Sequence, residues 1–121
     1  MRASFLVKAG QVEVREIDSP ELESDEVLIR VAAVGVCGSD THYYHHGKIG
    51  PYVVDEPLIL GHEASGTIVA VGSAVSNDRI GKRVSIEPQR PCKNCEQCLA
   101  GRYNLCPSME FYATPPIHGA F

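Results

Sequence analysis

Four cysteines close together in the second half of the chain constrain its fold more than any other feature. They follow the pattern Cys92-x2-Cys95-x2-Cys98-x7-Cys106. Spacings of two residues allow one tight loop to direct several thiolates at a single point, and the longer excursion returns the fourth. A structural zinc ion takes four such ligands at ~2.3 Å in a closed tetrahedron. The cluster therefore predicts a zinc lobe, at about residues 88–110, in which the metal serves folding rather than chemistry.

The four cysteines also admit two other interpretations. They can be reduced thiols without a ligand, or they can hold an iron–sulfur cluster. A C-x2-C-x2-C run with a later Cys-Pro, here Cys106-Pro107, is similar to the pattern of bacterial ferredoxins. Those proteins have three residues before the last cysteine, whereas this chain has seven. The spacing therefore favours zinc over an iron–sulfur cluster.

Composition and charge exclude several classes of protein. The 121 residues are 44% hydrophobic and 21% charged, so we expect one globular domain over residues 1–121. Eleven basic and fifteen acidic residues give a net charge of −4, which argues against a nucleic-acid-binding protein. The longest apolar runs, such as residues 31–37, fall far short of the ~20 residues of a membrane span, and no signal peptide is recognisable. We therefore expect a cytoplasmic protein with neither nucleic-acid nor membrane partners.

The apolar pattern predicts short strands and little helix, which favours an antiparallel barrel or sandwich. The first two strands form a hairpin, with the valines at 12 and 14 on one face and Glu13 and Arg15 toward water. Residues 27–36 are apolar on both faces, which predicts a central strand. The expected strands are residues 3–7, 12–17, 27–36, 67–71 and 83–87. One helix is expected from an N-cap at Ser39 or Asp40 to about residue 46.

A second candidate site comes from two residues in glycine-flanked turns. Cys37 lies in GVCGSD, just after the long strand, and His62 lies in GHEASG. A free cysteine is often simply buried, and a lone histidine is more often structural than a ligand. The residues alone therefore leave open whether the two share a metal.

Several segments in unbroken order resemble the medium-chain zinc-dependent alcohol dehydrogenases. They are GVCGSD, GHEASGTIVAVGSAV, GKRVSIEP and the four-cysteine lobe. The final segment, GRYNLCPSMEFYATPP, resembles the polyol branch of that family, which contains the sorbitol and xylitol dehydrogenases. The similarity covers essentially all 121 residues.

The resemblance implies a mainly β fold, a GroES-like, partly open β-barrel with short helices and a four-cysteine zinc lobe. In the family an NAD(P)-binding domain follows, and this chain has no G-x-G-x-x-G or G-x-x-x-x-G-K-[ST] motif of its own. We therefore expect an incomplete catalytic domain that is inactive alone, with residues 118–121 opening another strand. The complete enzyme is expected to use NAD and to form a homotetramer.

The resemblance also implies the ligands of a catalytic zinc. It assigns Cys37 and His62 to this metal, and in the polyol branch a glutamate is the third ligand, for which Glu63 is the candidate. Neighbouring residues of an extended chain point to opposite sides, so Glu63 needs a bent backbone to join His62. Alternatively, Glu63 lies behind the ligands and supports them without binding the metal itself.

Four further residues receive roles from the resemblance. Ser39 hydrogen-bonds the reacting hydroxyl and starts a proton relay, and Asp40 supports the zinc-bound His62. Tyr43 and Phe111 line the polyol pocket. From the residues alone, the first two are helix caps and the last two are half-buried aromatics.

The implied function is oxidation of a secondary alcohol of sorbitol or xylitol to a ketose with NAD. Two alternatives are a non-catalytic zinc-binding module and another zinc alcohol dehydrogenase of the same family. His42, His45 and His46 have a helical spacing that permits metal binding. Because the segment is polar and the family places no ligands there, we expect them to be surface or cleft-rim residues.

Overall fold

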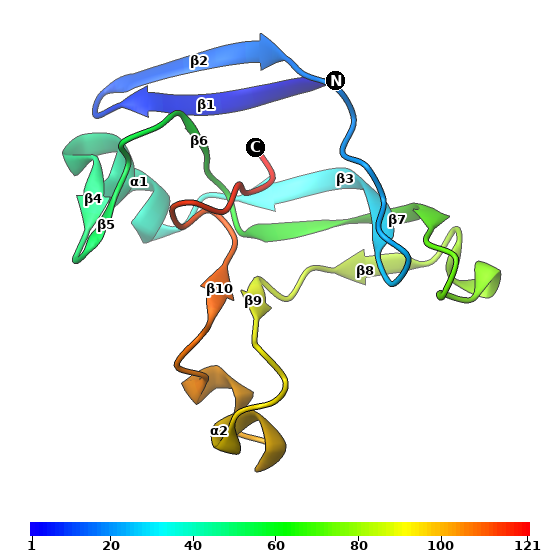
Figure 1. The fold of residues 1–121 in the computed structure, drawn as a ribbon. Coiled ribbons are helices and arrows are strands. Elements are labelled where there is room, and N and C mark those ends of the chain that lie inside the picture. The colour runs from blue at the N-terminus through cyan, green and yellow to red at the C-terminus, as the bar shows by residue number, and fades with distance from the viewer.

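The chain is built mainly of short strands, as the computed structural model of residues 1–121 shows (Figure 1). A β1–β2 hairpin lies above a layer of β3, β7 and β8, and the cysteine lobe extends away below. None of the helices has the length and apolar composition to span a bilayer. The elements are β1 (Arg2–Lys8), β2 (Gln11–Glu16), β3 (Val27–Gly35), α1 (Gly38–His46), β4 (Lys48–Ile49), β5 (Tyr52–Val53), β6 (Leu58–Ile59), β7 (Glu63–Val71), the 3-10 helix η1 (Asn77–Arg79), β8 (Arg83–Ser85), β9 (Gln89–Arg90), α2 (Glu96–Leu99), the 3-10 helix η2 (Tyr103–Leu105) and β10 (Glu110–Phe111).

The predicted N-terminal hairpin is confirmed, but the orientation expected for its second strand is wrong. Val12 and Val14 are 48% and 67% exposed. In the antiparallel register Glu13 lies opposite the buried Phe5, so the charged residues share the face of Phe5. Arg15 pairs with Glu13 at 2.9 Å, and its guanidinium lies over the Phe5 ring. The aliphatic stem and planar head of arginine can cover apolar surface in this way.

The second sheet has the order β3-β7-β8, so the prediction that residues 27–36 form a central strand is wrong. The central strand is β7, which begins at Glu63 rather than at Thr67. The other edge of β3 is unpaired, and Val31 is 41% exposed. Gly66 allows β7 to approach β3 closely, because a Cβ there would lie 2.3 Å from the Arg30 carbonyl oxygen.

Two small clusters make up the core between the hairpin and α1. Leu6 packs with residues of α1 and β6, and Phe5 packs with Ala3 and Ile59. Residues 118–121 are not a regular strand, but they lie along β6: the Gly119 N–H donates to the Ile59 carbonyl at 2.7 Å. The four sheets do not close into one barrel, so the expected mainly β, partly open architecture is confirmed.

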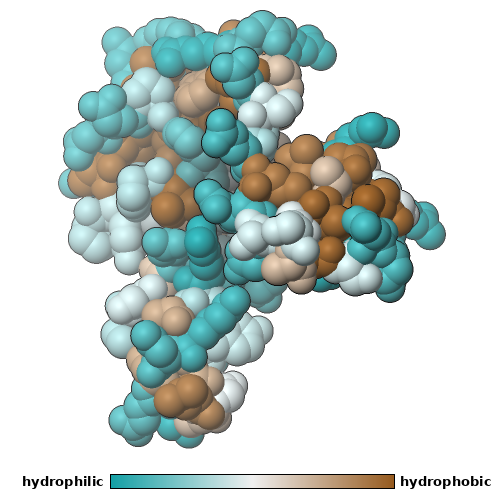
Figure 2. Space-filling model, turned by 45° about the vertical axis from the view of Figure 1, so that its right-hand side comes forward, coloured by the Kyte–Doolittle hydropathy of each residue, from teal (hydrophilic) through white to brown (hydrophobic).

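Apolar side chains also gather on the surface of the β3–β7–β8 layer (Figure 2). They line a hollow that contains Leu22, Val27, Leu28, Ile29, Ile68 and Val84. The cysteine lobe leaves this layer through β9 and β10, which pair antiparallel and carry an Arg90–Glu110 ion pair at 3.6 Å. This two-stranded neck joins the lobe to the rest of the fold and holds it away from the strand layers (Figure 1).

Candidate metal centres and the adjoining pocket

The first candidate centre is built where β3 passes into α1. The N-cap of α1 is Cys37, and not Ser39 or Asp40 as predicted. Asp40 instead occupies the third helical position, where its Oδ2 accepts a hydrogen bond from the Cys37 N–H at 2.8 Å. This arrangement is a capping box, in which a carboxylate satisfies the N–H of the cap residue. It fixes the backbone that presents the Cys37 thiol.

Asp40 also positions His62, through the backbone. Its Oδ1 accepts a hydrogen bond from the Gly61 N–H at 3.1 Å, and the side chain is only 4% exposed. Gly61 has a positive φ of 87°, a conformation that glycine adopts without strain. The His62 Nδ1 lies 4.0 Å from Oδ1, which is beyond hydrogen-bond range. The carboxylate therefore holds the segments on both sides of the site rather than the imidazole itself.

Cys37, His62 and Glu63 bring one sulfur, one nitrogen and one carboxylate oxygen within 4.8 Å of one another. The turn at Gly61 lies just before β7, which lets adjacent side chains converge. Glu63 lies opposite Gly35, and a Cβ on Gly35 would be 2.4 Å from its Oε2. The bare glycine thus leaves the space that the carboxylate fills. Thiolate, imidazole and carboxylate suit a zinc ion that keeps a fourth position open.

The second candidate centre lies in the cysteine lobe. All four sulfur atoms lie within 4.8 Å of one another. The Cys95–Cys98 pair is 3.4 Å apart, and the Cys92–Cys98 and Cys95–Cys106 pairs are 3.9 Å apart. A tetrahedron with ~2.3 Å zinc–sulfur bonds has edges of about 3.8 Å. The geometry therefore fits one zinc ion and leaves no room for the several atoms of an iron–sulfur cluster.

The cysteine sulfurs influence each other's ionisation. A hydrogen bond from the Asn94 backbone, helped by neighbouring cysteines, lowers the pKa of Cys92 to about 6. Burial, followed by the neighbouring Cys95, raises the pKa of Cys98 to about 12. Four negative sulfurs this close repel one another, so a cation is needed to hold all of them as thiolates. The donor set is therefore matched to a divalent metal.

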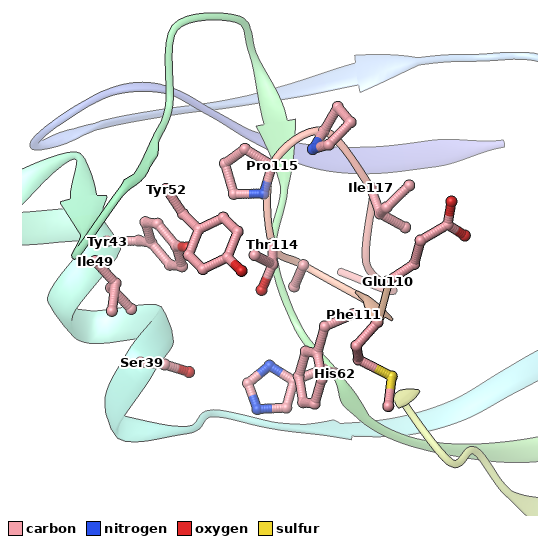
Figure 3. A pocket seen from close by; sticks show the side chains of 13 residues that line it. Ser39, Tyr43, Ile49, Tyr52, His62, Glu110, Phe111, Thr114, Pro115 and Ile117 are labelled. Atoms are coloured by element: carbon pink, nitrogen blue, oxygen red, sulfur yellow. The ribbon is translucent and has the colours of Figure 1, made fainter. Parts of the chain in front are cut away.

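A pocket of about 580 Å³ adjoins the first centre (Figure 3). It contains four residues predicted from the sequence, because Ser39 and Tyr43 face it from α1 while His62 and Phe111 close another side. The rings of His62 and Phe111 meet edge to face, with centroids 5.3 Å apart. The sequence reasoning missed the remaining lining residues, which are Ile49, Tyr52, Met109, Glu110, Ala113, Thr114, Pro115, Pro116 and Ile117.

The missed pocket residues come from two segments without a periodic pattern. Ile49 and Tyr52 flank the turn of the β4–β5 hairpin, where Gly50-Pro51 was the only signal. Thr114 lies in the proline-containing segment after β10. Burial raises the pKa of Tyr43, and the Thr114 side chain partly offsets this rise. The Tyr43 phenol is therefore a neutral hydrogen-bond donor in the pocket.

Comparisons with known proteins identify the family. The model of the alcohol dehydrogenase GroES-like domain matches residues 23–121. This chain belongs to that family. The GroES-like domain is 51% identical over 121 residues to the sorbitol dehydrogenase of Bacillus subtilis, and 52% identical over 120 residues to the D-xylulose reductase of Morganella morganii. The matches cover 100% and 98% of this chain but 34% and 36% of the relatives, so the chain spans about a third of their length.

The fold of this GroES-like domain is also found in solved structures. The crystal structure of galactitol-1-phosphate dehydrogenase from Escherichia coli superposes with a TM-score of 0.88 and 36% sequence identity. The match covers 100% of this chain and 34% of that protein. The resemblance to alcohol dehydrogenases and to their polyol branch is thereby confirmed.

Proposed function

We propose that the complete protein containing this chain is a zinc-dependent polyol dehydrogenase. It oxidises a secondary alcohol of sorbitol or xylitol to the ketose, with NAD as the hydride acceptor. The observation that carries this proposal is the convergence of Cys37, His62 and Glu63 beside a pocket with several hydroxyl groups. The similarity to a sorbitol dehydrogenase and a D-xylulose reductase supports the choice of substrate class.

Cys37, His62 and Glu63 would hold the catalytic zinc. When bound, zinc acts as a Lewis acid and lowers the pKa of an alcohol that reaches its open position. Ser39 faces the same pocket as His62, and its hydroxyl can both accept and donate a proton. We assign it the first step of the proton relay, in which it accepts the substrate hydroxyl proton and passes its own proton outward.

The substrate chain lies along the aromatic side of the pocket. The neutral phenol of Tyr43 donates a hydrogen bond to a substrate hydroxyl, and Phe111 packs against the carbon chain and the His62 ring. Apolar side chains such as Ile49 and Ile117 also line the pocket. Asp40 holds the Cys37 and Gly61 backbone so that the ligands, among them His62, stay together.

The four cysteines would hold a structural zinc that stabilises the lobe. Their thiolates have to stay reduced, so we place the protein in the cytoplasm. The homotetramer implied by the resemblance stays a prediction, and analytical ultracentrifugation of the complete protein tests it.

The test is the kinetics of the complete protein with sorbitol and xylitol, followed by NADH absorbance. Ser39→Ala should lower kcat by ~10²–10⁴-fold at full zinc content, because a positioned proton-transfer group contributes about this much. His62→Ala should lose one zinc equivalent and nearly all activity. Ser73→Ala, an exposed serine in a turn, is the matched control and should leave kcat unchanged.

Two results would contradict the proposal. A fully zinc-loaded protein that reduces neither NAD nor NADP with any polyol is not a polyol dehydrogenase. A Ser39→Ala variant with wild-type kcat, when a deuterium isotope effect shows that chemistry limits the rate, removes Ser39 from the relay.

A further inference from the structure

The second half of α1 carries metal-ligating side chains that the proposed function does not use. His42 and His46 lie four residues apart, and their ring centroids are 4.5 Å apart with an interplanar angle of 50°. Both side chains are exposed, and neither lines the pocket that Ser39 and Tyr43 face from the same helix. The two imidazoles therefore form a pair at the surface of this domain.

A spacing of four residues places two histidines on the same face of a helix, one turn apart. The HExxH motif uses the same spacing to bind one zinc ion through both imidazoles. Here the pair is already close, so binding one ion requires only small side-chain rotations. The C-terminal end of a helix also carries partial negative charge, which favours a cation near His46.

We propose that His42 and His46 form a two-histidine surface site for a divalent late transition-metal ion. Imidazole nitrogen is a preferred ligand of nickel, copper and zinc ions, and water completes the coordination of an exposed site. This site is separate from the cluster of Cys37, His62 and Glu63. Cys37 caps the opposite end of α1, and His46 lies nine residues later, about 13 Å along the helix axis.

His45 is not a member of the site and provides a matched control. It directly precedes His46, so the two side chains leave the helix in different directions. Their ring centroids are 6.3 Å apart, and the His45 ring meets Tyr44 edge to face at 5.2 Å. His42 and His46 thus form the chelating pair, and His45 is an exposed histidine nearby that lies outside it.

The experiment is isothermal titration calorimetry of the complete protein with Ni²⁺ at pH 7.5. The protein is made without a histidine tag and is loaded beforehand with two equivalents of zinc, one for each cluster that contains cysteine, and loosely bound zinc is removed by gel filtration before the titration. Wild type and His45→Gln should bind one more equivalent of Ni²⁺ than His42→Gln or His46→Gln. Circular dichroism of each variant checks that the exposed substitutions leave the fold intact.

The proposal is wrong if wild type and His42→Gln bind the same number of Ni²⁺ ions. It is also wrong if His45→Gln loses the same equivalent as His46→Gln, because that result assigns binding to the histidine segment as a whole. Polyol oxidation is not a readout of this experiment. Its outcome is therefore independent of the function proposed above.

Discussion

Removal of the Asp40 carboxylate should loosen both segments that present the ligands of the first centre. Asp40 accepts one hydrogen bond from the Cys37 N–H and one from the Gly61 N–H. Gly61 lies 21 residues after Asp40 in the sequence, so the second bond joins two distant segments. In Asp40→Ala both amides lose their acceptor. A buried donor without a partner costs ~1–3 kcal/mol.

The two amides should respond differently because their environments differ. The bond to Gly61 is buried, whereas the bond to Cys37 is partly accessible, so water can replace the carboxylate only at Cys37. A loss of ~1–3 kcal/mol corresponds to an increase of about 5- to 150-fold in local opening. We expect local opening to increase within this range at the Gly61 amide, and only by the lower end of the range at the Cys37 amide. Asp40→Asn keeps one acceptor oxygen and replaces the other with a donor, so one of the two amides should stay protected.

Amide hydrogen exchange of the complete protein measures these changes directly. Exchange at Gly61 should accelerate most in Asp40→Ala, and zinc content should fall because Cys37 and His62 are no longer held together. Exchange in the distant hairpin, for example at Arg15, which lies opposite Ala3 in the ladder, serves as the internal control. A Gly61 amide that exchanges at the wild-type rate in Asp40→Ala would show that the carboxylate does not hold this turn.

Two further substitutions test the metal centres separately. Cys95→Ser should release about one zinc equivalent and lower the melting temperature while the Cys37 cluster keeps its metal, and elemental analysis that finds unchanged zinc would contradict this. Gly35→Ala places a Cβ 2.4 Å from Oε2 of Glu63, so the carboxylate must turn away and zinc at the Cys37 cluster should bind more weakly. Gly38→Ala is its control, since a Cβ there meets nothing within 4 Å, and equal zinc affinity in the two variants would refute the argument.

Local sequence patterns predicted much of the fold correctly. The N-terminal hairpin, the long strand after residue 26 and the helix after Cys37 all depend on turn residues and apolar runs within short segments. The very short strands β4, β5, β6, β9 and β10 were missed, because two residues carry no periodicity. The partners of β6, β9 and β10 are distant in sequence, so only the assembled fold pairs them, whereas β4 and β5 pair across the two-residue turn at Gly50-Pro51.

Errors of orientation have a related cause. The alternation of Val12 and Glu13 predicts a buried apolar face and an exposed polar face. The register with β1 instead places Glu13 opposite Phe5, on the side of the hairpin that faces the core. The apolar residues of β3 read as a central strand, but β7 takes that position and leaves one edge of β3 unpaired. Which face is covered depends on the neighbouring elements, and a single segment does not contain that information.

The two metal centres differ in the same way: local spacing in the sequence predicts one of them, and only the tertiary structure assembles the other. The four cysteines lie within fifteen residues, so their spacing alone was sufficient to predict a shared ion. Cys37 and His62 are 25 residues apart, and the residues alone left their association open. The buried Asp40 carboxylate joins the two segments, the bare Gly35 leaves room for Glu63, and the β4–β5 hairpin completes the pocket. These contacts exist only after the chain has folded, because each depends on atoms that approach one another through long-range packing.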